Sequence, residues 1–312
     1  MTTMDSVAPA VAAAEVLDRG RPPRKRSGMR TIYPGWFFIP AIALYVVFFA
    51  VPTFASFYFA FTRWDFFTAT WIGFDNFVQF FQDPQLLNGF IHTFEYGFAT
   101  SAAKVLLGFI IALLLTGPIF ARGYLRVIIF FPVLLSTIGV GILWKSLLDP
   151  FHGVVNSVLG LLHLPQPGWF TDPSTALATI MGVDVWKGVG IATLIFMAGI
   201  VAIPTEYFEA AKVDGASSWK ILRTITIPLT RPATATVIIL SLIGGLRSFD
   251  LVQAITNGGP GFTSEVITSV IYKEYQAGYF GLSTAGNVVL FVVVTAIMVP
   301  LTTYLNRRTV EL

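Results

Sequence analysis

The sequence predicts an all-α integral membrane protein with six transmembrane helices. Of its 312 residues, 55% are hydrophobic and only 12% are charged, and the mean hydropathy is +0.73. Soluble domains carry roughly 25% charged residues, so lipid must cover much of this chain. The hydrophobic residues also gather in long runs that are nearly free of charge. Such runs supply the roughly 20 apolar residues that a helix needs to cross the bilayer.

Six segments meet this length requirement, and we take each as one span. They cover residues 36–61, 91–117, 125–147, 175–202, 231–256 and 281–305. We expect the fourth and fifth to be the least hydrophobic, because the fourth is interrupted by Asp184 and Lys187 and the fifth carries Arg247 and Asp250.

Together the spans define a six-helix transmembrane domain over residues 31–308. Residues 1–30 differ in composition, being rich first in alanine and then in arginine, proline and glycine. We expect them to form a disordered basic cytoplasmic tail.

The distribution of Lys and Arg predicts the orientation of the spans. If the N-terminus is cytoplasmic, the inner segments and the residues adjoining them hold fourteen of the twenty basic side chains. Basic residues concentrate on the cytoplasmic side of membrane proteins. We therefore predict a multi-pass membrane protein with both termini in the cytoplasm.

The composition excludes several kinds of site. There are no cysteines, which rules out thiol catalysis and thiolate metal ligands. The three histidines lack metal-ligand spacing, no catalytic cluster occurs, and a net charge of +3 is too small to indicate nucleic acid binding. The phosphate-binding pattern G-x-x-x-x-G-K-[ST] is missing as well. We predict no catalytic residue, no metal site and no ATPase site in this chain.

The loop between the fourth and fifth spans, residues 203–230, predicts two short helices outside the bilayer. The first begins after Pro204, with Glu206 and Glu209 in its first turn, where the helix dipole favours acidic side chains. Gly215 then permits a left-handed exit from the helix.

A second short helix is predicted at 219–226. Ser217 and Ser218 can cap its start, and Pro228 should end it. Two amphipathic helices at a sharp angle form a rigid knob, which suits a surface on which a soluble partner pushes.

Two motifs in this region resemble a known family. The first is an EAA signature like that of binding-protein-dependent ABC importer permeases, although Ile227 stands where the family usually has Leu. Its matching residues are Glu209, Ala210, Ala211, Gly215, Ile225 and Pro228. The second resembles the F-D…T-x-G-G-P segment of the carbohydrate-uptake (MalF-like) branch, and comprises Phe249, Asp250, Thr256, Gly258, Gly259 and Pro260.

The resemblance implies a permease subunit of the bacterial plasma (inner) membrane that forms the translocation path for a mono- or oligosaccharide. In that family an extracellular substrate-binding protein delivers the solute, a second homologous permease completes the path, and two separate ATPase subunits bind ATP and Mg. This chain itself would need no cofactor. The residues implied to couple it to the ATPase are Glu209, Ala210, Ala211, Asp214, Gly215 and Ala216.

Charged side chains within the spans are the other candidates for function, because charge at membrane depth is costly unless it is paired or hydrated. Asp184 and Lys187 are three residues apart on one helix and can pair with each other. Lys104 can either form a buried ion pair or face a cavity as a charge. Asp250 can help to hold the turn at 258–260.

The resemblance also implies a substrate path on the fourth and fifth spans. MalF-like subunits carry a sugar-stacking Trp at the position of Trp186, 23 residues before Glu209; packing or an interface is the alternative role for this side chain. The implied path residues are Asp184, Trp186, Gly188, Ile191, Ser241, Gly244, Gly245 and Ser248.

Two other functions stay open at this point. A permease for glycerol-3-phosphate or a related phosphorylated polyol is the main alternative, since Arg247 and Lys104 could attract an anion. A secondary transporter fits less well, because such proteins commonly have more spans and inverted repeats.

Overall fold

The computed structural model describes residues 35–307, so the predicted tail at 1–30 lies outside the described residues. The chain divides into two compact units, residues 1–53 and 54–312. Within the described residues, the regular secondary structure is helical apart from one antiparallel hairpin, β1 (Thr62–Trp64) and β2 (Ala69–Trp71). The all-helical membrane class is therefore confirmed, with this hairpin as an addition.

The first span is a run of consecutive helical pieces. It consists of η1 (Gly35–Phe38), α2 (Ile39–Tyr45), η2 (Val46–Ala50) and α3 (Val51–Phe59). Together they give a helical stretch from Trp36 to Phe59 that is long and apolar enough to cross a membrane. This matches the prediction at 36–61.

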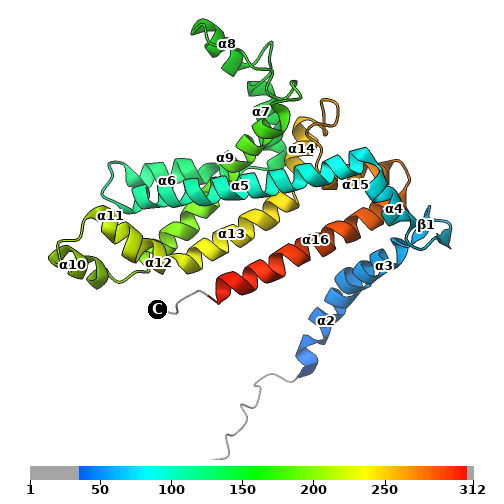
Figure 1. Cartoon of the computed structure of the whole chain (residues 1–312), viewed down its shortest axis with the longest axis horizontal. Coiled ribbons are helices and arrows are strands. Elements are labelled where there is room, and N and C mark those ends of the chain that lie inside the picture. Colours follow the sequence, from blue (N-terminus) through cyan, green and yellow to red (C-terminus); the bar gives the residue numbers. More distant parts are fainter. Residues whose placement is uncertain (1–34, 308–312) are drawn as a thin grey trace, which may run out of the picture. The chain divides into compact units, whose positions relative to one another are not determined.

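The second unit contains the remaining elements. They are α4 (Asp75–Gln82), α5 (Pro84–Thr116), α6 (Arg122–Phe130), η3 (Phe131–Leu134), α7 (Thr137–Leu147), α8 (Val154–Leu161), α9 (Ala176–Val201), α10 (Thr205–Val213), α11 (Ser218–Ile221), η4 (Leu222–Thr226), α12 (Ile227–Leu229), α13 (Arg231–Leu246), α14 (Asp250–Ile255), α15 (Ile267–Gln276) and α16 (Phe280–Asn306). The helices α5, α9, α13 and α16 lie side by side as its centre (Figure 1).

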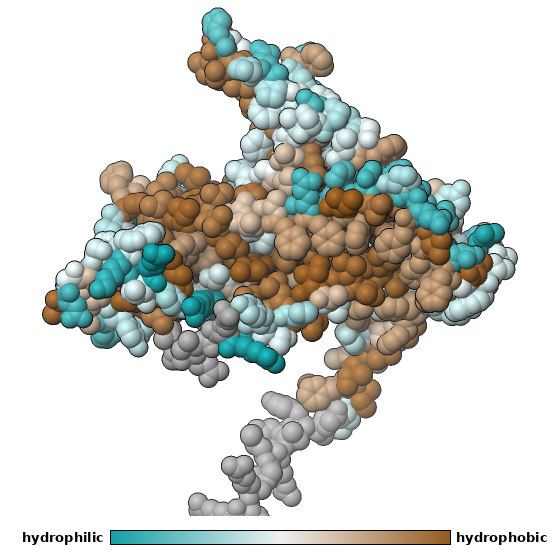
Figure 2. Space-filling view, in the orientation of Figure 1, coloured by the Kyte–Doolittle hydropathy of each residue, from teal (hydrophilic) through white to brown (hydrophobic). Residues whose placement is uncertain are grey.

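Within residues 35–307, four continuous helices are long and apolar enough to cross a membrane, and two bent pairs would raise the number to six. Figure 2 shows hydrophobic residues over the middle of α5, α13 and α16, with hydrophilic residues gathered over α10 and α11 at one end and over α4 at the other. This is the surface expected of a lipid-embedded bundle.

The predicted third span, 125–147, is wrong as a single straight helix. The chain turns by 103° between Arg122–Leu134 and Thr137–Leu147. Pro132 lies in the 3-10 turn before the break, and Leu135 and Ser136 are extended. Proline has no N–H for a helical hydrogen bond, so this stretch ends one helix and the next begins afresh.

The predicted fifth span, 231–256, is also divided. The helix α13 ends at Leu246, and α14 begins only at Asp250. By contrast, the structure confirms the fourth and sixth spans to within one residue, as α9 and α16. The second span begins earlier than predicted, at Pro84, because the Asp83 side chain accepts the N–H groups of the first turn of α5.

Small residues let the central helices pack closely. Gly245 of α13 lies against Gly97 of α5, where a Cβ on Gly245 would lie 2.7 Å from the Gly97 Cα. Gly108 of α5 meets Ala192 of α9 in the same way. Close backbone approach through small residues is the usual basis of helix association in membranes.

Candidate coupling segment and translocation path

The segment between α9 and α13 begins with the exposed helix α10. Pro204 precedes it in an extended conformation, and Glu206 lies in its first turn. Glu209 lies in the second turn, so its predicted place in the first turn is wrong. Apart from partly buried Phe208 and Ala211, the side chains of α10 are exposed, which leaves this helix available to a partner.

A left-handed turn at Gly215 ends α10. The N–H of Ala216 donates to the Ala211 carbonyl at 2.9 Å, and the N–H of Gly215 donates to the Lys212 carbonyl at 3.0 Å. This is the Schellman pattern, in which the residue after the cap adopts a positive φ. Gly215 has a φ of +71° and open space around it. The predicted left-handed exit is confirmed.

The second short helix runs further than predicted. Ser217 Oγ accepts the N–H of Lys220 at 3.3 Å, which confirms the cap. Pro228 does not end the helix, however, because the chain widens into the π-helical turn η4 and continues through α12 to Leu229. The wide turn leaves room for a residue without an N–H.

The knob carries exposed apolar side chains as well as charges. Val213 is 87% and Trp219 is 64% exposed, and the Arg223 guanidinium lies over the Trp219 ring at 5.9 Å. Exposed apolar groups rimmed by charge are typical of a protein-binding surface.

A buried ion pair joins α5 and α9 within the bundle. Lys104 Nζ donates to Asp184 Oδ2 at 2.6 Å, and the two side chains are 9% and 20% exposed. The described residues show no ion pair between Asp184 and Lys187, so that predicted pair is wrong. Of the two roles left open for Lys104, the buried pair is confirmed, and this side chain also borders a cavity.

This cavity lies between α5, α9 and α13 and has a volume of about 230 Å³. Four of the predicted path residues line it, together with Lys104: Gly188, Ile191, Ser241 and Gly244. A Cβ on Gly188 would lie 2.6 Å from the Lys104 Cε. The glycine therefore gives the lysine stem room to cross α9 and reach Asp184.

Trp186 borders a second, larger cavity of about 680 Å³ on the side of α7. Its ring meets Trp144 edge to face, with centroids 5.3 Å apart, and it is 37% exposed. Trp169 and Thr179 line the same cavity. The sequence patterns did not indicate Trp144, because its contact with Trp186 depends on the bend between α6 and α7.

The remaining two predicted path residues lie elsewhere. Gly245 is buried against Gly97, in the contact between α13 and α5. Ser248 lies beyond the end of α13, and its carbonyl accepts a hydrogen bond from the Thr268 hydroxyl. Because α13 ends at Leu246, Ser248 does not continue the helical face that carries Ser241 and Gly245.

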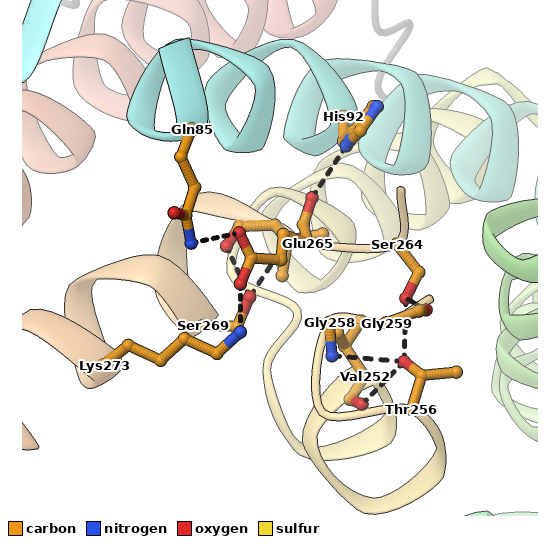
Figure 3. A network of polar contacts seen from close by, with 11 residues as sticks. Gln85, His92, Val252, Thr256, Gly258, Gly259, Ser264, Glu265, Ser269 and Lys273 are labelled. Atoms are coloured by element: carbon orange, nitrogen blue, oxygen red, sulfur yellow. Dashed lines mark hydrogen bonds and ion pairs between the residues drawn. The ribbon is translucent and has the colours of Figure 1, made fainter. Parts of the chain in front are cut away.

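A polar network that includes the T-x-G-G-P segment links α15 to α5 (Figure 3). Glu265 is fully buried, and Lys273 and Gln85 both donate to its carboxylate. The His92 ring contacts the Glu265 carbonyl at 3.0 Å. The network was missed from sequence, although Glu265 and Lys273 are opposite charges only eight residues apart.

The T-x-G-G-P turn itself is held by hydroxyl groups. The Thr256 and Ser264 hydroxyls are 2.8 Å apart, and Ser264 also donates to the Gly259 carbonyl at 2.5 Å. Gly258 has a φ of +86°, and a Cβ there would lie 2.4 Å from the Glu265 Cγ. Within the described residues, no hydrogen bond joins Asp250 to this turn, so its predicted role there is not supported.

Comparison with known proteins agrees with this arrangement. Residues 100–311 match the family described as the binding-protein-dependent transport system inner membrane component. The chain is 30% identical over 258 residues to the trehalose/maltose transport system permease protein MalF of Thermococcus litoralis, covering 82% of this chain and 88% of that protein. It is 32% identical over 310 residues to the diacetylchitobiose uptake system permease protein NgcF of Streptomyces coelicolor, covering 93% and 87%.

The fold is also similar to a solved structure. A chain of a bacterial ABC transporter involved in the import of the acidic polysaccharide alginate aligns with a TM-score of 0.79 at 25% identity, covering 87% of this chain and 94% of that one. The family match spans more than half of the sequence. The chain therefore belongs to the binding-protein-dependent inner membrane components, as the permease, not the ATPase, of an ABC importer.

Proposed function

We propose that this permease forms half of the path for a neutral mono- or oligosaccharide. The observation that carries the proposal is the buried Lys104–Asp184 pair at the cavity between α5, α9 and α13. Because Asp184 already compensates the lysine, the cavity presents no net charge to the solute. A neutral polyhydroxylated ring suits such a path better than an anion does.

The aromatic cavity on the side of α7 supports the same solute class. The Trp186 and Trp144 rings offer apolar faces to the C–H side of a pyranose, while Ser241 in the smaller cavity can hydrogen-bond its hydroxyl groups. Each such contact contributes about 1 kcal/mol net, because water competes for the same groups. Weak binding of this kind allows the solute to be released. The relatives named for trehalose/maltose and diacetylchitobiose uptake favour a saccharide too.

We further propose that the knob at 203–230 docks on a separate ATPase subunit in the cytoplasm. The coupling residues would be Glu209, Ala210, Ala211, Asp214, Gly215 and Ala216. The exposed Trp219 and Val213 supply apolar area for this contact. Both termini would then lie in the cytoplasm, and the working assembly would contain a second permease, two ATPase subunits and an extracellular binding protein.

A phosphorylated polyol is the second candidate, because Arg247 is exposed at the end of α13 and forms no ion pair within the described residues. The discriminating experiment reconstitutes the assembly in proteoliposomes and measures uptake of a saccharide panel against glycerol-3-phosphate. The proposal expects uptake of a saccharide and none of the phosphate. Uptake of the phosphate alone would reject the neutral solute.

Trp186→Ala tests the path itself. Loss of about 1 kcal/mol of stacking should weaken solute affinity roughly fivefold, with assembly and basal ATP hydrolysis retained. Trp36→Ala is the matched control, because Trp36 is 67% exposed at the start of the first span. Equal uptake by the two variants would assign Trp186 to packing.

A further inference from the structure

The hairpin β1–β2 is fixed at the ends of two membrane-crossing helices. Only two residues separate it from the end of α3, and the Trp64 ring stacks on Phe59 at 4.1 Å. On the other side, Phe280, the first residue of α16, meets Phe66 at 4.0 Å and Trp64 at 5.8 Å. The hairpin therefore lies where the apolar part of the bundle ends.

The tip of this hairpin is built to expose aromatic rings. Asp65 accepts the backbone N–H groups of Phe67 and Thr68 at 3.0 and 2.6 Å, and the Thr68 hydroxyl at 3.0 Å. Phe66 is held at a φ of +70°, a conformation that is unfavourable for a bulky residue. The result is that Phe67 is 95% exposed and Phe66 54% exposed.

The surroundings of the tip have the composition of a membrane interface. Trp71 and Phe74 are 61% and 69% exposed close by, and Arg63 on β1 is exposed with no ion pair among the described residues. Aromatic rings concentrate at the level of the lipid headgroups, where an arginine can bind phosphate bidentately. Exposure of so many aromatic rings to water on one short segment would be unfavourable, and such a patch typically marks an interaction site or a membrane contact.

We propose that this hairpin is an interfacial anchor whose tip inserts into the bilayer beside the spans. Phe67 and Phe66 lie at the boundary between headgroups and acyl chains, and Arg63 contacts a phospholipid phosphate. The surface is continuous with the ends of α3 and α16, which belong to helices long and apolar enough to cross a membrane. The proposed orientation of the chain makes this the outer leaflet, and the anchoring itself does not depend on the identity of the solute.

The absence of cysteine from the chain permits a direct test by site-directed spin labelling. Phe67→Cys is labelled with a nitroxide in the complete transporter, with the partners' own cysteines replaced, in nanodiscs of zwitterionic phospholipid. The collision rates of the nitroxide with two reagents then report its depth in the bilayer. Oxygen concentrates in lipid, whereas a nickel chelate stays in water. Spin-labelled lipids in the same discs calibrate the scale. Because the side chain is 95% exposed, its replacement should not impair folding.

The control is His152→Cys, because the His152 side chain is 92% exposed in a loop away from the hairpin. We expect the label at 67 to show an oxygen-to-nickel ratio several-fold above that of the control, at the level of lipids labelled near the headgroup. A nickel-rich signal equal to the control would place the tip in water and overturn the proposal. Low collision with both reagents would show that a protein partner covers the tip, which would overturn it as well.

Discussion

Breaking the Lys104–Asp184 ion pair should destabilise the permease strongly. Lys104→Met removes the ammonium that lies 2.6 Å from Asp184 Oδ2 and leaves the carboxylate only 20% exposed. Removing one partner of a buried pair costs about 3–5 kcal/mol, and a lone charge within a span costs about 3 kcal/mol. We therefore expect a loss near 3 kcal/mol, a factor of roughly 100 in the folding equilibrium.

A double-mutant cycle separates this charge effect from packing. Lys104→Met with Asp184→Leu removes both charges, and replacement of a buried pair by apolar groups is often close to neutral. The double variant should therefore recover most of the stability that either single variant loses. The stability of each purified assembly is measured as the fraction that stays monodisperse after heating, at several temperatures.

Lys187→Met is the matched control, because Lys187 lies one turn from Asp184 on the same helix and forms no ion pair within the described residues. It should change stability little. If the losses of the two single variants simply add in the double variant, the pair contributes no coupling energy and the reasoning fails. A loss in Lys187→Met as large as in Lys104→Met would point to a general effect of charge in this helix instead.

Three further predictions concern the turns at Gly215 and Gly258 and the helix α15. Gly215→Val, at a φ of +71°, should cost about 1–3 kcal/mol in backbone strain and abolish ATP-driven uptake while the protein still inserts into the membrane. Gly215→Asn is the control and should keep uptake, because asparagine tolerates this φ. Full uptake by the Val variant would contradict the coupling role. Gly258→Ala should lower the free energy of unfolding by about 2 kcal/mol or more, because the added Cβ would overlap Glu265. Gly261→Ala is the control and should cost only about 1 kcal/mol, because Gly261 has a positive φ but open space around it. Equal losses of thermal stability in the two variants would refute the overlap. Burial and two nearby carboxylates raise the pKa of Glu274 above its ordinary value, so its ionisation opposes folding and stability should fall as pH rises through that raised pKa. Glu274→Gln should therefore raise the melting temperature at about pH 8, and this gain should shrink toward acidic pH. A gain in melting temperature that does not depend on pH would contradict this prediction.

The parts of the fold that depend on local composition could be read from the sequence. Long, mostly apolar runs place α9 and α16 to within one residue, because the bilayer demands a continuous apolar length from each helix. The left-handed exit at Gly215 was equally predictable, since glycine adopts a positive φ without a steric penalty. The bend between α6 and α7 was not, because the charge-free run from Val127 to Trp144 continues across it.

By itself, then, the sequence determined the membrane class, most of the spans and the two-helix knob, because these follow from local chemistry and from short motifs. Only the tertiary structure decided which charges pair. Lys187 lies three residues from Asp184, whereas Lys104 lies eighty residues away in the chain, and yet Lys104 is the partner. The choice depends on the close packing of α5 on α9, where Gly188 leaves space for the lysine stem, and spacing along one helix carries no information about such a contact between two.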